Sequence, residues 1–479
     1  MTAEPAISRR DVGLRSERGP ILLALMLSTG LIAIDATILA TAVPSIVKDL
    51  GGFASFPWLF SVYLLAQAVS VPIYAKLVDS IGRKPLLLYG IGMFLLGSIL
   101  CGFAPSMLML ILFRAVQGLG AGAIMPTAIT VAGDIYTLAE RAKAQGYLAS
   151  VWAISSVVGP TLGGVFSQFV SWRWIFFVNV PLCIAAAVLV RRYEETPNRS
   201  RHRVDVPGAI LLTAGLTALL LGLLQGGQAW PWLSLPGLGL PAVAVVLLVA
   251  FVLVERRAPE PVLPLWVFSR RLLLTTGLIS AAVGAFLLGL TSYIPNFLEA
   301  VGGASPLESG LALALLTLGW PIAASNAGRF YLRLGFRPTA LIGSSVALVG
   351  AVGILLVTPL ASIWATGAAC LVVGLGLGTV ATPTLIAGQS SVGFADRGVV
   401  TGSNTFLRSV GSAVGVAVFG AIANAVLAGR TSPAAVGSAS GAVFLGVVVA
   451  GALLLVAALV MPAFRAEHAA QPEAEGAAA

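Results

Sequence analysis

The feature that most constrains this chain is a succession of long apolar segments, each of the length needed to cross a lipid bilayer. A membrane-spanning helix needs about 20 largely apolar residues. Barrel strands instead alternate apolar and polar residues over about 10 positions, and these segments do not alternate. Fourteen segments qualify, with the approximate limits 20–45, 57–77, 86–104, 107–131, 144–169, 174–190, 207–225, 237–254, 272–295, 307–326, 339–357, 363–386, 399–425 and 440–462. The sequence therefore predicts an all-α integral membrane protein with fourteen transmembrane helices.

The composition agrees with this prediction and excludes several soluble functions. Only 10% of the residues are charged and 58% are hydrophobic, whereas soluble domains carry about 25% charged residues. No Gly-Lys-Ser/Thr phosphate loop occurs, so ATP hydrolysis is unsupported, and we expect no enzyme activity and no cofactor. The residues with metal-binding chemistry lack ligand spacing or lie in apolar runs, where cysteines serve as packing residues: Cys101, Cys183, Cys370, His202 and His468.

The basic residues set the expected orientation. With fourteen spans, 23 of the 28 basic residues fall on the side that holds both termini. Only Lys48, Arg173 and Arg430 fall on the other side. The positive-inside rule then places both termini in the cytoplasm. The net charge of +9 forms no continuous stripe, so we expect no nucleic acid partner. Residues 1–19 form a polar cytoplasmic tail rather than a signal peptide, and 463–479 form a cytoplasmic tail with a disordered composition.

The chain also carries an internal repeat. Gly82-Arg83-Lys84-Pro85 after the second span matches Gly335-Phe336-Arg337-Pro338 after the tenth. Further matches lie 256 residues apart: Gly118, Gly120 and Gly122 with Gly374, Gly376 and Gly378, and Arg141 with Arg397. We therefore expect two six-helix bundles, 20–190 and 272–462. Between them, 191–271 supplies cytoplasmic loops and a two-helix insert. Such a repeat predicts a binding site between the halves, near the bilayer midplane.

Five motifs occur in order along the spans. They are Asp35-Ala-Thr37-Ile-Leu-Ala-Thr41-Ala-Val-Pro44, Lys76-Leu-Val-Asp79-Ser-Ile-Gly82-Arg83-Lys84, Arg114-Ala-Val-Gln117-Gly118-Leu-Gly120-Ala-Gly122, Gly159-Pro160-Thr-Leu-Gly163-Gly164 and Trp172-Arg173-Trp174-Ile-Phe176-Phe177-Val-Asn179-Val-Pro181. With these motifs the chain resembles the major facilitator superfamily, and within it the fourteen-span drug:proton antiporters. It departs from the family pattern at Ala75, where glycine is usual, at Ser80, where a basic residue is usual, and at Ala40, where asparagine is usual.

The residues expected to couple transport to protons are Asp35 and Arg114. Asp35 is the only acidic residue placed deep in a span, where an ionisable group costs roughly 2.5–3.5 kcal/mol on insertion scales. A buried carboxyl favours its neutral form, and an antiporter needs a group that loads and releases a proton. The resemblance makes Arg114 an electrostatic partner, with Asp35 as the candidate carboxylate. The alternative is a structural aspartate bonded to backbone or to Thr37 and Thr41.

Two motifs are expected to serve conformational change. The loop residues Asp79, Gly82, Arg83 and Lys84 are candidates for an ion-paired cytoplasmic gate, with simple positive-inside anchoring as the alternative. In Gly159-Pro160-Thr-Leu-Gly163-Gly164 the proline removes a helix hydrogen bond and the glycines allow close approach of a neighbour. This pattern suits a bending gate or, alternatively, an ordinary tight crossing.

Other polar and aromatic residues in spans are candidates to line a substrate cavity: Tyr63, Gln67, Gln117, Trp152, Asn179, Asn296, Trp320 and Asn404. Each alone is more often a packing residue. Glu299, near the outer end of the ninth span, is a candidate to attract cations or take protons at the exit, although such a residue is more often simply solvated. Arg408 in the thirteenth span is expected to extend toward the cytoplasm.

The resemblance implies proton-coupled export of lipophilic or cationic drug-like compounds across the bacterial inner membrane, by a protein that functions as a monomer in membrane lipid. A dedicated exporter of one endogenous metabolite, antibiotic or lipid needs the same machinery and remains open. A proton-coupled importer is disfavoured by the motif in span five. A membrane sensor leaves Asp35 and the repeat unexplained.

Overall fold

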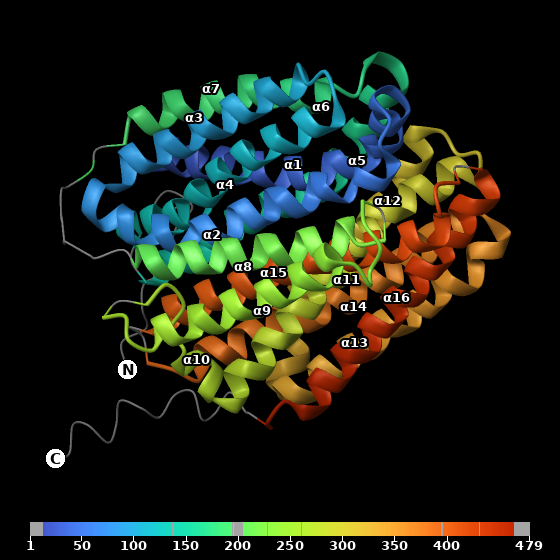
Figure 1. Cartoon of the computed structure of the whole chain (residues 1–479). Helices are drawn as coiled ribbons and strands as arrows, with labels where there is room; N and C mark the ends of the chain where they lie inside the picture. Colours follow the sequence, from blue (N-terminus) through green and yellow to red (C-terminus); the bar gives the residue numbers. More distant parts are fainter. Residues whose placement is uncertain are drawn as a thin grey trace.

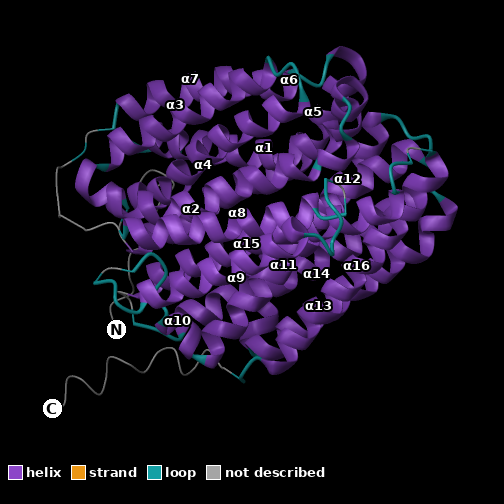
Figure 2. Cartoon of the chain, in the orientation of Figure 1, coloured by secondary structure: helices purple, strands orange, loops and turns teal. Residues whose placement is uncertain are grey.

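The computed structural model describes residues 13–136, 138–193, 195, 205–227, 229–259, 261–393, 396–430 and 432–463. The first twelve residues of the predicted N-terminal tail and the predicted C-terminal tail from 464 onward lie outside these ranges. Within them the chain is almost entirely helical (Figure 2). Fourteen helical segments are long and apolar enough to cross a membrane, and each overlaps one of the predicted spans.

The helices fall into two six-span halves and an insert. The N half contains α1 (Gly19–Leu50), α2 (Pro57–Ile81), α3 (Arg83–Gly102), α4 (Met107–Ile135), α5 (Leu138–Val165), α6 (Trp174–Phe177) and α7 (Asn179–Arg191), with α6 and α7 forming one span. The insert is α8 (Val206–Gln225) and α9 (Leu235–Glu255). The C half contains α11 (Arg271–Ala300), α12 (Pro306–Leu334), α13 (Phe336–Val357), α14 (Ile363–Ser390), α15 (Arg397–Leu427) and α16 (Pro433–Val460). Shorter helical turns are η1 (Phe53–Ser55), η2 (Phe166–Val170), α10 (Trp266–Ser269) and η3 (Thr358–Leu360).

Local signals explain where the helices begin. The last span starts at Pro433, several residues before the limit of 440 that hydropathy alone predicts. Ser432 accepts a hydrogen bond from the amide of Ala435. A serine N-cap followed by proline is a strong start signal, and a hydropathy window does not register it. Ser305 and Glu308 form a reciprocal capping box at the start of α12.

The two halves use glycine in the same places. Gly82 turns α2 into α3 with φ of 109°, and Gly335 turns α12 into α13 with φ of 93°. Such positive φ values favour glycine. A Cβ built on Gly120 would lie 2.8 Å from the carbonyl oxygen of Gly90, and one on Gly376 would lie 2.7 Å from that of Gly343. The residues matched by the repeat thus make equivalent contacts, α3 with α4 and α13 with α14.

The bundle has two ends. We call the end that holds the α2–α3 and α12–α13 connections proximal, and the end that holds the α1–α2, α5–α6 and α11–α12 connections distal (Figure 1). One large apolar cluster joins distal residues of the N half, such as Val43 and Phe56, to the C half. Proximal residues of the N half, such as Leu25 and Ile91, belong to a separate cluster without any C-half member. The halves therefore share one apolar core at the distal end and have separate cores at the proximal end.

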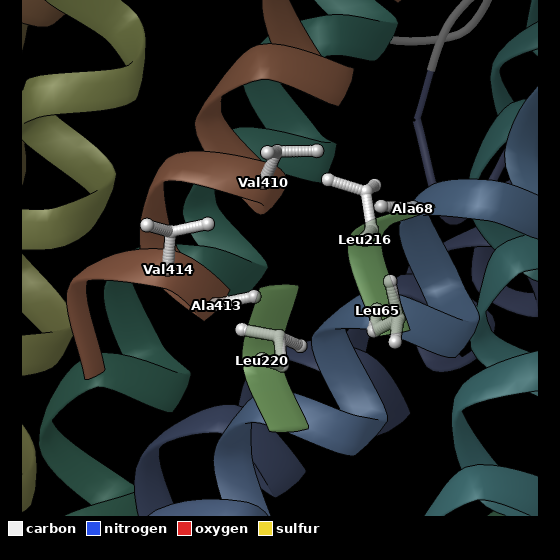
Figure 3. A pocket seen from close by; sticks show the side chains of 7 residues that line it. All are labelled: Leu65, Ala68, Leu216, Leu220, Val410, Ala413 and Val414. Atoms are coloured by element: carbon white, nitrogen blue, oxygen red, sulfur yellow. The ribbon is translucent and has the colours of Figure 1, made fainter. Parts of the chain in front are cut away.

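The insert covers one seam between the halves. Helix α8 packs against α2 of the N half and α15 of the C half. Apolar side chains from all three helices surround a void of about 10 Å³ (Figure 3), lined by Leu65, Ala68, Leu216, Leu220, Val410, Ala413 and Val414. A space of this size is at the lower limit for one water molecule, so α8 closes the seam with apolar packing. Helix α9 packs on α8.

Candidate functional site

The centre of the N half holds a buried ion pair. Asp35 lies near the middle of α1, and Arg114 lies in the distal part of α4. Nη1 of Arg114 donates to Oδ2 of Asp35 over 2.7 Å, and each side chain is only 1% exposed. Nε of Arg114 also donates to the carbonyl oxygen of Leu59 on α2, over 3.1 Å. The pair therefore ties three helices of the N half together.

Gln117 completes the coordination of the carboxylate. It lies one helical turn after Arg114, so both side chains leave α4 on one face. Its Nε2 donates to Oδ1 of Asp35 over 2.8 Å, and its Oε1 accepts from Arg114 over 2.6 Å. Both carboxylate oxygens of Asp35 therefore accept a hydrogen bond. In a low-dielectric site, removing one partner of such a pair typically costs 3–5 kcal/mol.

The network continues away from the ion pair into the wall of the N half. Gln117 donates to Oγ of Ser98 on α3 over 2.8 Å, and Nδ2 of Asn179 on α7 donates to the same oxygen over 3.2 Å. On the other side, the guanidinium of Arg114 lies 4.0 Å from the ring centroid of Tyr63, within range of a cation–π interaction. The site therefore draws side chains from α1, α2, α3, α4 and α7.

The threonines near Asp35 form hydrogen bonds to backbone oxygens and not to its carboxylate. Oγ1 of Thr37 is within hydrogen-bond reach of two backbone oxygens of α1 and of that of Ser155 on α5. Oγ1 of Thr41 is within hydrogen-bond reach of the backbone oxygens of Ile38 and Pro160. The alternative in which these hydroxyls hold the Asp35 carboxylate is therefore wrong for this conformation, because Arg114 and Gln117 hold it.

The glycines of the span-five motif lie where α5 meets other helices. A Cβ on Gly159 or Gly163 would collide with Thr37 or Thr41 of α1, and one on Gly164 would lie 2.6 Å from the carbonyl oxygen of Pro306 on α12. Helix α5 continues through Pro160 without interruption and changes to a π-helical turn only at η2. The irregular segment expected at the proline thus lies several residues later. The motif brings α5 against both α1 and the C half.

The distal seam is sealed by backbone contact between the halves. A Cβ on Gly310 of α12 would lie 2.6 Å from the carbonyl oxygen of Pro160. On the opposite seam, Ser61 of α2 donates to the carbonyl oxygen of Ala413, and Asn424 of α15 donates to that of Ala54. These contacts all lie distal to the ion pair or level with it, so the described conformation is closed at the distal end.

The loop between α2 and α3 is held by a residue that sequence reasoning missed. Oε1 and Oε2 of Glu195, in the segment after α7, accept from the amides of Arg83 and Lys84 over 2.5 and 3.1 Å. An anion at a helix N-terminus is stabilised by the helix dipole. Nζ of Lys84 donates to the carbonyl oxygen of Arg191. The predicted ion pair of Asp79 and Arg83 cannot be placed, because the Asp79 side chain lies outside the described residues.

Comparison with known proteins gives the family. The Major Facilitator Superfamily model matches residues 25–416. The chain therefore belongs to this superfamily. It is 35% identical over 416 residues to Multidrug resistance protein 3 of Bacillus subtilis (strain 168), covering 86% of this chain and 81% of that protein. It is also 35% identical over 418 residues to the Multidrug transporter protein MdtP of the same organism, covering 86% of this chain and 76% of that protein.

Solved structures show the same fold at low sequence identity. An inward-facing, unoccupied bacterial homolog of the human lysosomal transporter Spinster has a TM-score of 0.68 at 18% identity, covering 93% of this chain and 97% of that one. A D-xylose-proton symporter has a TM-score of 0.65 at 13% identity, covering 94% and 98%. The protein is thus a multi-pass membrane transporter of the major facilitator fold, with efflux proteins among its relatives and a two-helix insert between its halves.

Of the predicted cavity residues, Tyr63 and Gln117 meet at Arg114, Asn179 joins them through Ser98, and the others are not brought together with them. Tyr63, Gln117 and Asn296 are buried, and Asn296 donates to the backbone of its own helix at Ser292. Asn404 of α15 accepts from Ser280 of α11 over 2.6 Å. The remaining candidates are partly buried: Gln67, Trp152 and Trp320. The predicted solvation of Glu299 is wrong in part, because Ser309 donates to its carboxylate over 2.7 Å.

Two residues that contribute to the buried network and to the α2–α3 loop were not predicted from the sequence. Ser98 resembles the many small packing residues of the spans, and only its place opposite Gln117 gives it a role. Glu195 lies 112 residues from Arg83 in sequence. A glutamate shortly after a span is an ordinary loop residue, and no local pattern indicates that it caps a different helix.

Proposed function

We propose that this major facilitator transporter exports lipophilic or cationic drug-like compounds in exchange for protons, by alternating access. The observation that carries the proposal is the buried Asp35–Arg114 pair, because it places a carboxylate that can take a proton in the core of the transport fold. The 35% identity to two multidrug proteins supports the direction and class of transport.

Proton binding at Asp35 would change the forces that hold the N half together. In the described arrangement both of its oxygens are hydrogen-bonded, one to a guanidinium and one to an amide. A proton on either oxygen removes the negative charge and one acceptor site. Arg114 is then left without its counter-ion, and α1 is held less tightly to α4.

Helix α1 can pass this change on to the rest of the molecule. It packs on α5 in its own half and on α11 and α12 in the C half. Its threonines Thr37 and Thr41 meet α5 at the motif that also touches α12. Loosening α1 therefore acts directly on the distal seam. The shared core at the distal end and the separate cores at the proximal end support a rocking motion that opens one end as it closes the other.

The orientation forms part of the proposal. The excess of basic residues near the proximal end favours a cytoplasmic location for both termini, so the described state would face the cytoplasm. The bacterial relatives favour the plasma membrane. The partners in this proposal are a small lipophilic substrate, protons and membrane lipid, with no nucleic acid, and the transporter acts as a monomer.

The test is transport in everted membrane vesicles with a lipophilic cationic dye. Dye should accumulate only when a proton gradient is imposed, and an uncoupler should abolish accumulation. Asp35→Asn should abolish gradient-driven uptake while leaving dye binding in place. The matched control is Asp396→Asn, an exposed carboxyl at the start of α15. Gradient-driven uptake that survives in Asp35→Asn, with its pH dependence unchanged, would exclude this carboxyl as the coupling group.

The same vesicles separate the broad exporter from a dedicated one. A panel of chemically unrelated drugs should give several substrates that compete with one another. Transport of a single endogenous metabolite, antibiotic or lipid, with no drug accepted, would select the dedicated exporter and leave the coupling assignment intact.

A further inference from the structure

Arg408 is a second intramembrane guanidinium, and the proposed mechanism does not use it. It lies in α15, about 16 Å from the start of the helix at about 1.5 Å per residue. That position is well inside a helix that spans Arg397–Leu427. Within the part of the chain that the structure describes, Arg408 makes no side-chain hydrogen bond and no ion pair. Arg114, by contrast, contacts a carboxylate, an amide, a backbone oxygen and a ring.

The packing of α15 fixes the direction of the Arg408 side chain. Val410 and Val414 point toward α8, on the outer side of the seam (Figure 3). At about 100° per residue, the side chains of positions 408 and 410 leave the helix about 160° apart. A Cβ on Gly284 of α11 would collide with the backbone oxygen of Arg408. Arg408 therefore points away from α8, along the edge of the α11 contact, and into the region between the halves.

The internal repeat supports this placement. Residues 256 positions apart are equivalent, so Arg408 corresponds to Trp152 of α5. The contacts around them also correspond. A Cβ on Gly30 of α1 would meet Val151, and one on Gly277 of α11 would meet Leu407. The repeat thus pairs an indole on the N half with a guanidinium on the C half.

The charges deep in the spans do not cancel. Asp35 and Arg114 neutralise each other in a direct ion pair, and Arg408 leaves one positive charge. A cation at this depth is unfavourable by roughly 2.5–3.5 kcal/mol on insertion scales. A lipophilic anion would offset that cost, whereas a lipophilic cation would add to it. No other deep carboxylate is found among the described residues to hold a cation.

We propose that Arg408 is the anchor for the anionic group of an amphiphilic substrate, a carboxylate, sulfonate or phosphate ester whose apolar body lies toward Trp152. This inference rests on the proposed export function, and within its substrate class it selects lipophilic acids in place of cationic compounds. Guanidinium groups bind such oxyanions with paired, charge-assisted hydrogen bonds. Ser412 lies one helical turn after Arg408 and leaves α15 on nearly the same face, so its hydroxyl is a candidate to bind the same oxyanion.

The test is equilibrium binding in detergent without any proton gradient. The probes are a dansyl-labelled undecanoic acid and its methyl ester, which differ only in the charge of the headgroup. The wild-type protein should bind the acid more tightly than the ester. Arg408→Gln should weaken binding of the acid by about 10- to 100-fold, the size expected for a lost charge-assisted contact, and leave binding of the ester unchanged. Arg408→Lys should retain part of the preference.

The controls distinguish a folding defect, or a failure of the export function, from a failure of this inference. Arg430→Gln, in an exposed distal connection, should alter neither affinity. Retained binding of the ester shows that Arg408→Gln is folded. Displacement of the acid by dihexanoyl phosphatidylglycerol would identify a lipid headgroup as the natural anion. If the lipid does not displace the acid, the natural ligands are free lipophilic acids. Equal affinities for acid and ester, or an equal loss of both in Arg408→Gln, would overturn the proposal. Absence of proton-driven vesicle uptake for both the cationic dye and the dansyl-labelled acid would instead refute the export function, since binding needs no gradient.

Discussion

Replacing one glycine of the distal seam, Gly164, with valine should shift the transporter toward the state that is open at its distal end. A Cβ on Gly164 of α5 would lie 2.6 Å from the carbonyl oxygen of Pro306 and 2.8 Å from Cα of Leu307, both on α12. Backbone atoms cannot move aside as a flexible side chain can. Gly164→Val must therefore separate the two helices, and overpacking of this kind costs about 1–3 kcal/mol. That cost falls on the distal-closed state alone.

The magnitude follows from a two-state equilibrium. Because 1.4 kcal/mol changes an equilibrium constant tenfold, the ratio of distal-open to distal-closed molecules should rise roughly 5- to 140-fold. The reporter is Ser61→Cys, on the α2–α15 seam, where Ser61 is fully buried and contacts Ala413. It lies across the molecule from Gly164, so it responds to a movement of whole halves and not to local distortion. The native cysteines are buried and are replaced in the background.

The assay is the rate of labelling by a membrane-impermeant maleimide added to the distal side. Gly164→Val should raise this rate by a factor in the same range, and labelling from the distal side of oriented vesicles also tests the proposed orientation. Gly92→Val is the matched control, since a Cβ on that glycine of α3 meets no atom within 4 Å. Equal labelling rates in the two variants would refute both the rigid-body motion and the role given to the α5–α12 seam.

Three further substitutions test the site. Gln117→Leu removes the hydrogen bonds that Gln117 donates to Asp35 and Ser98 and the one that it accepts from Arg114, so it should lower the free energy of unfolding by about 1–3 kcal/mol, measured by thermal unfolding in detergent. Arg114→Gln should cost more, about 3–5 kcal/mol, and adding Asp35→Asn should restore part of that loss; a double variant less stable than Arg114→Gln alone would contradict the ion-pair assignment. Glu195→Ala should cost about 0.5–2 kcal/mol, the usual value of an N-terminal cap, with Glu195→Asp intermediate.

The spans were predictable because two independent signals agree on them. Apolar length finds each helix, and the sidedness of the basic residues constrains the count. The ends were less predictable, since capping decides them: Ser432 and Pro433 start the last helix well before the strongly apolar stretch. The break at Val178 between α6 and α7 falls within an apolar run and has no hydropathy signal.

Only those site residues that differ in polarity from the apolar residues around them could be predicted from the sequence. Asp35 and Arg114 could be predicted because a charged residue inside an apolar span is energetically costly, so its presence indicates a function or a partner. Gln117 was predicted as a cavity lining, yet it is a bonding partner of Asp35, a distinction that needs side-chain geometry. Ser98 and Glu195 act across the fold from Gln117 and Arg83, and contacts between distant segments leave no local trace in a single sequence.

The two halves share the same backbone arrangement but differ in their charged and polar side chains. Glycines at equivalent positions, such as Gly120 and Gly376, recur because the neighbouring backbone leaves no room for a Cβ in either half. Other positions of the repeat have no such constraint and differ: 256 residues on, Cys370 stands in the place of Arg114, and Arg408 in the place of Trp152. The N half therefore holds the neutral ion pair that we propose exchanges protons, and the C half holds the guanidinium that we propose binds the ligand. Substitutions at the repeated glycines should perturb folding and conformational change, whereas substitutions at the diverged positions should change coupling in one half and ligand preference in the other.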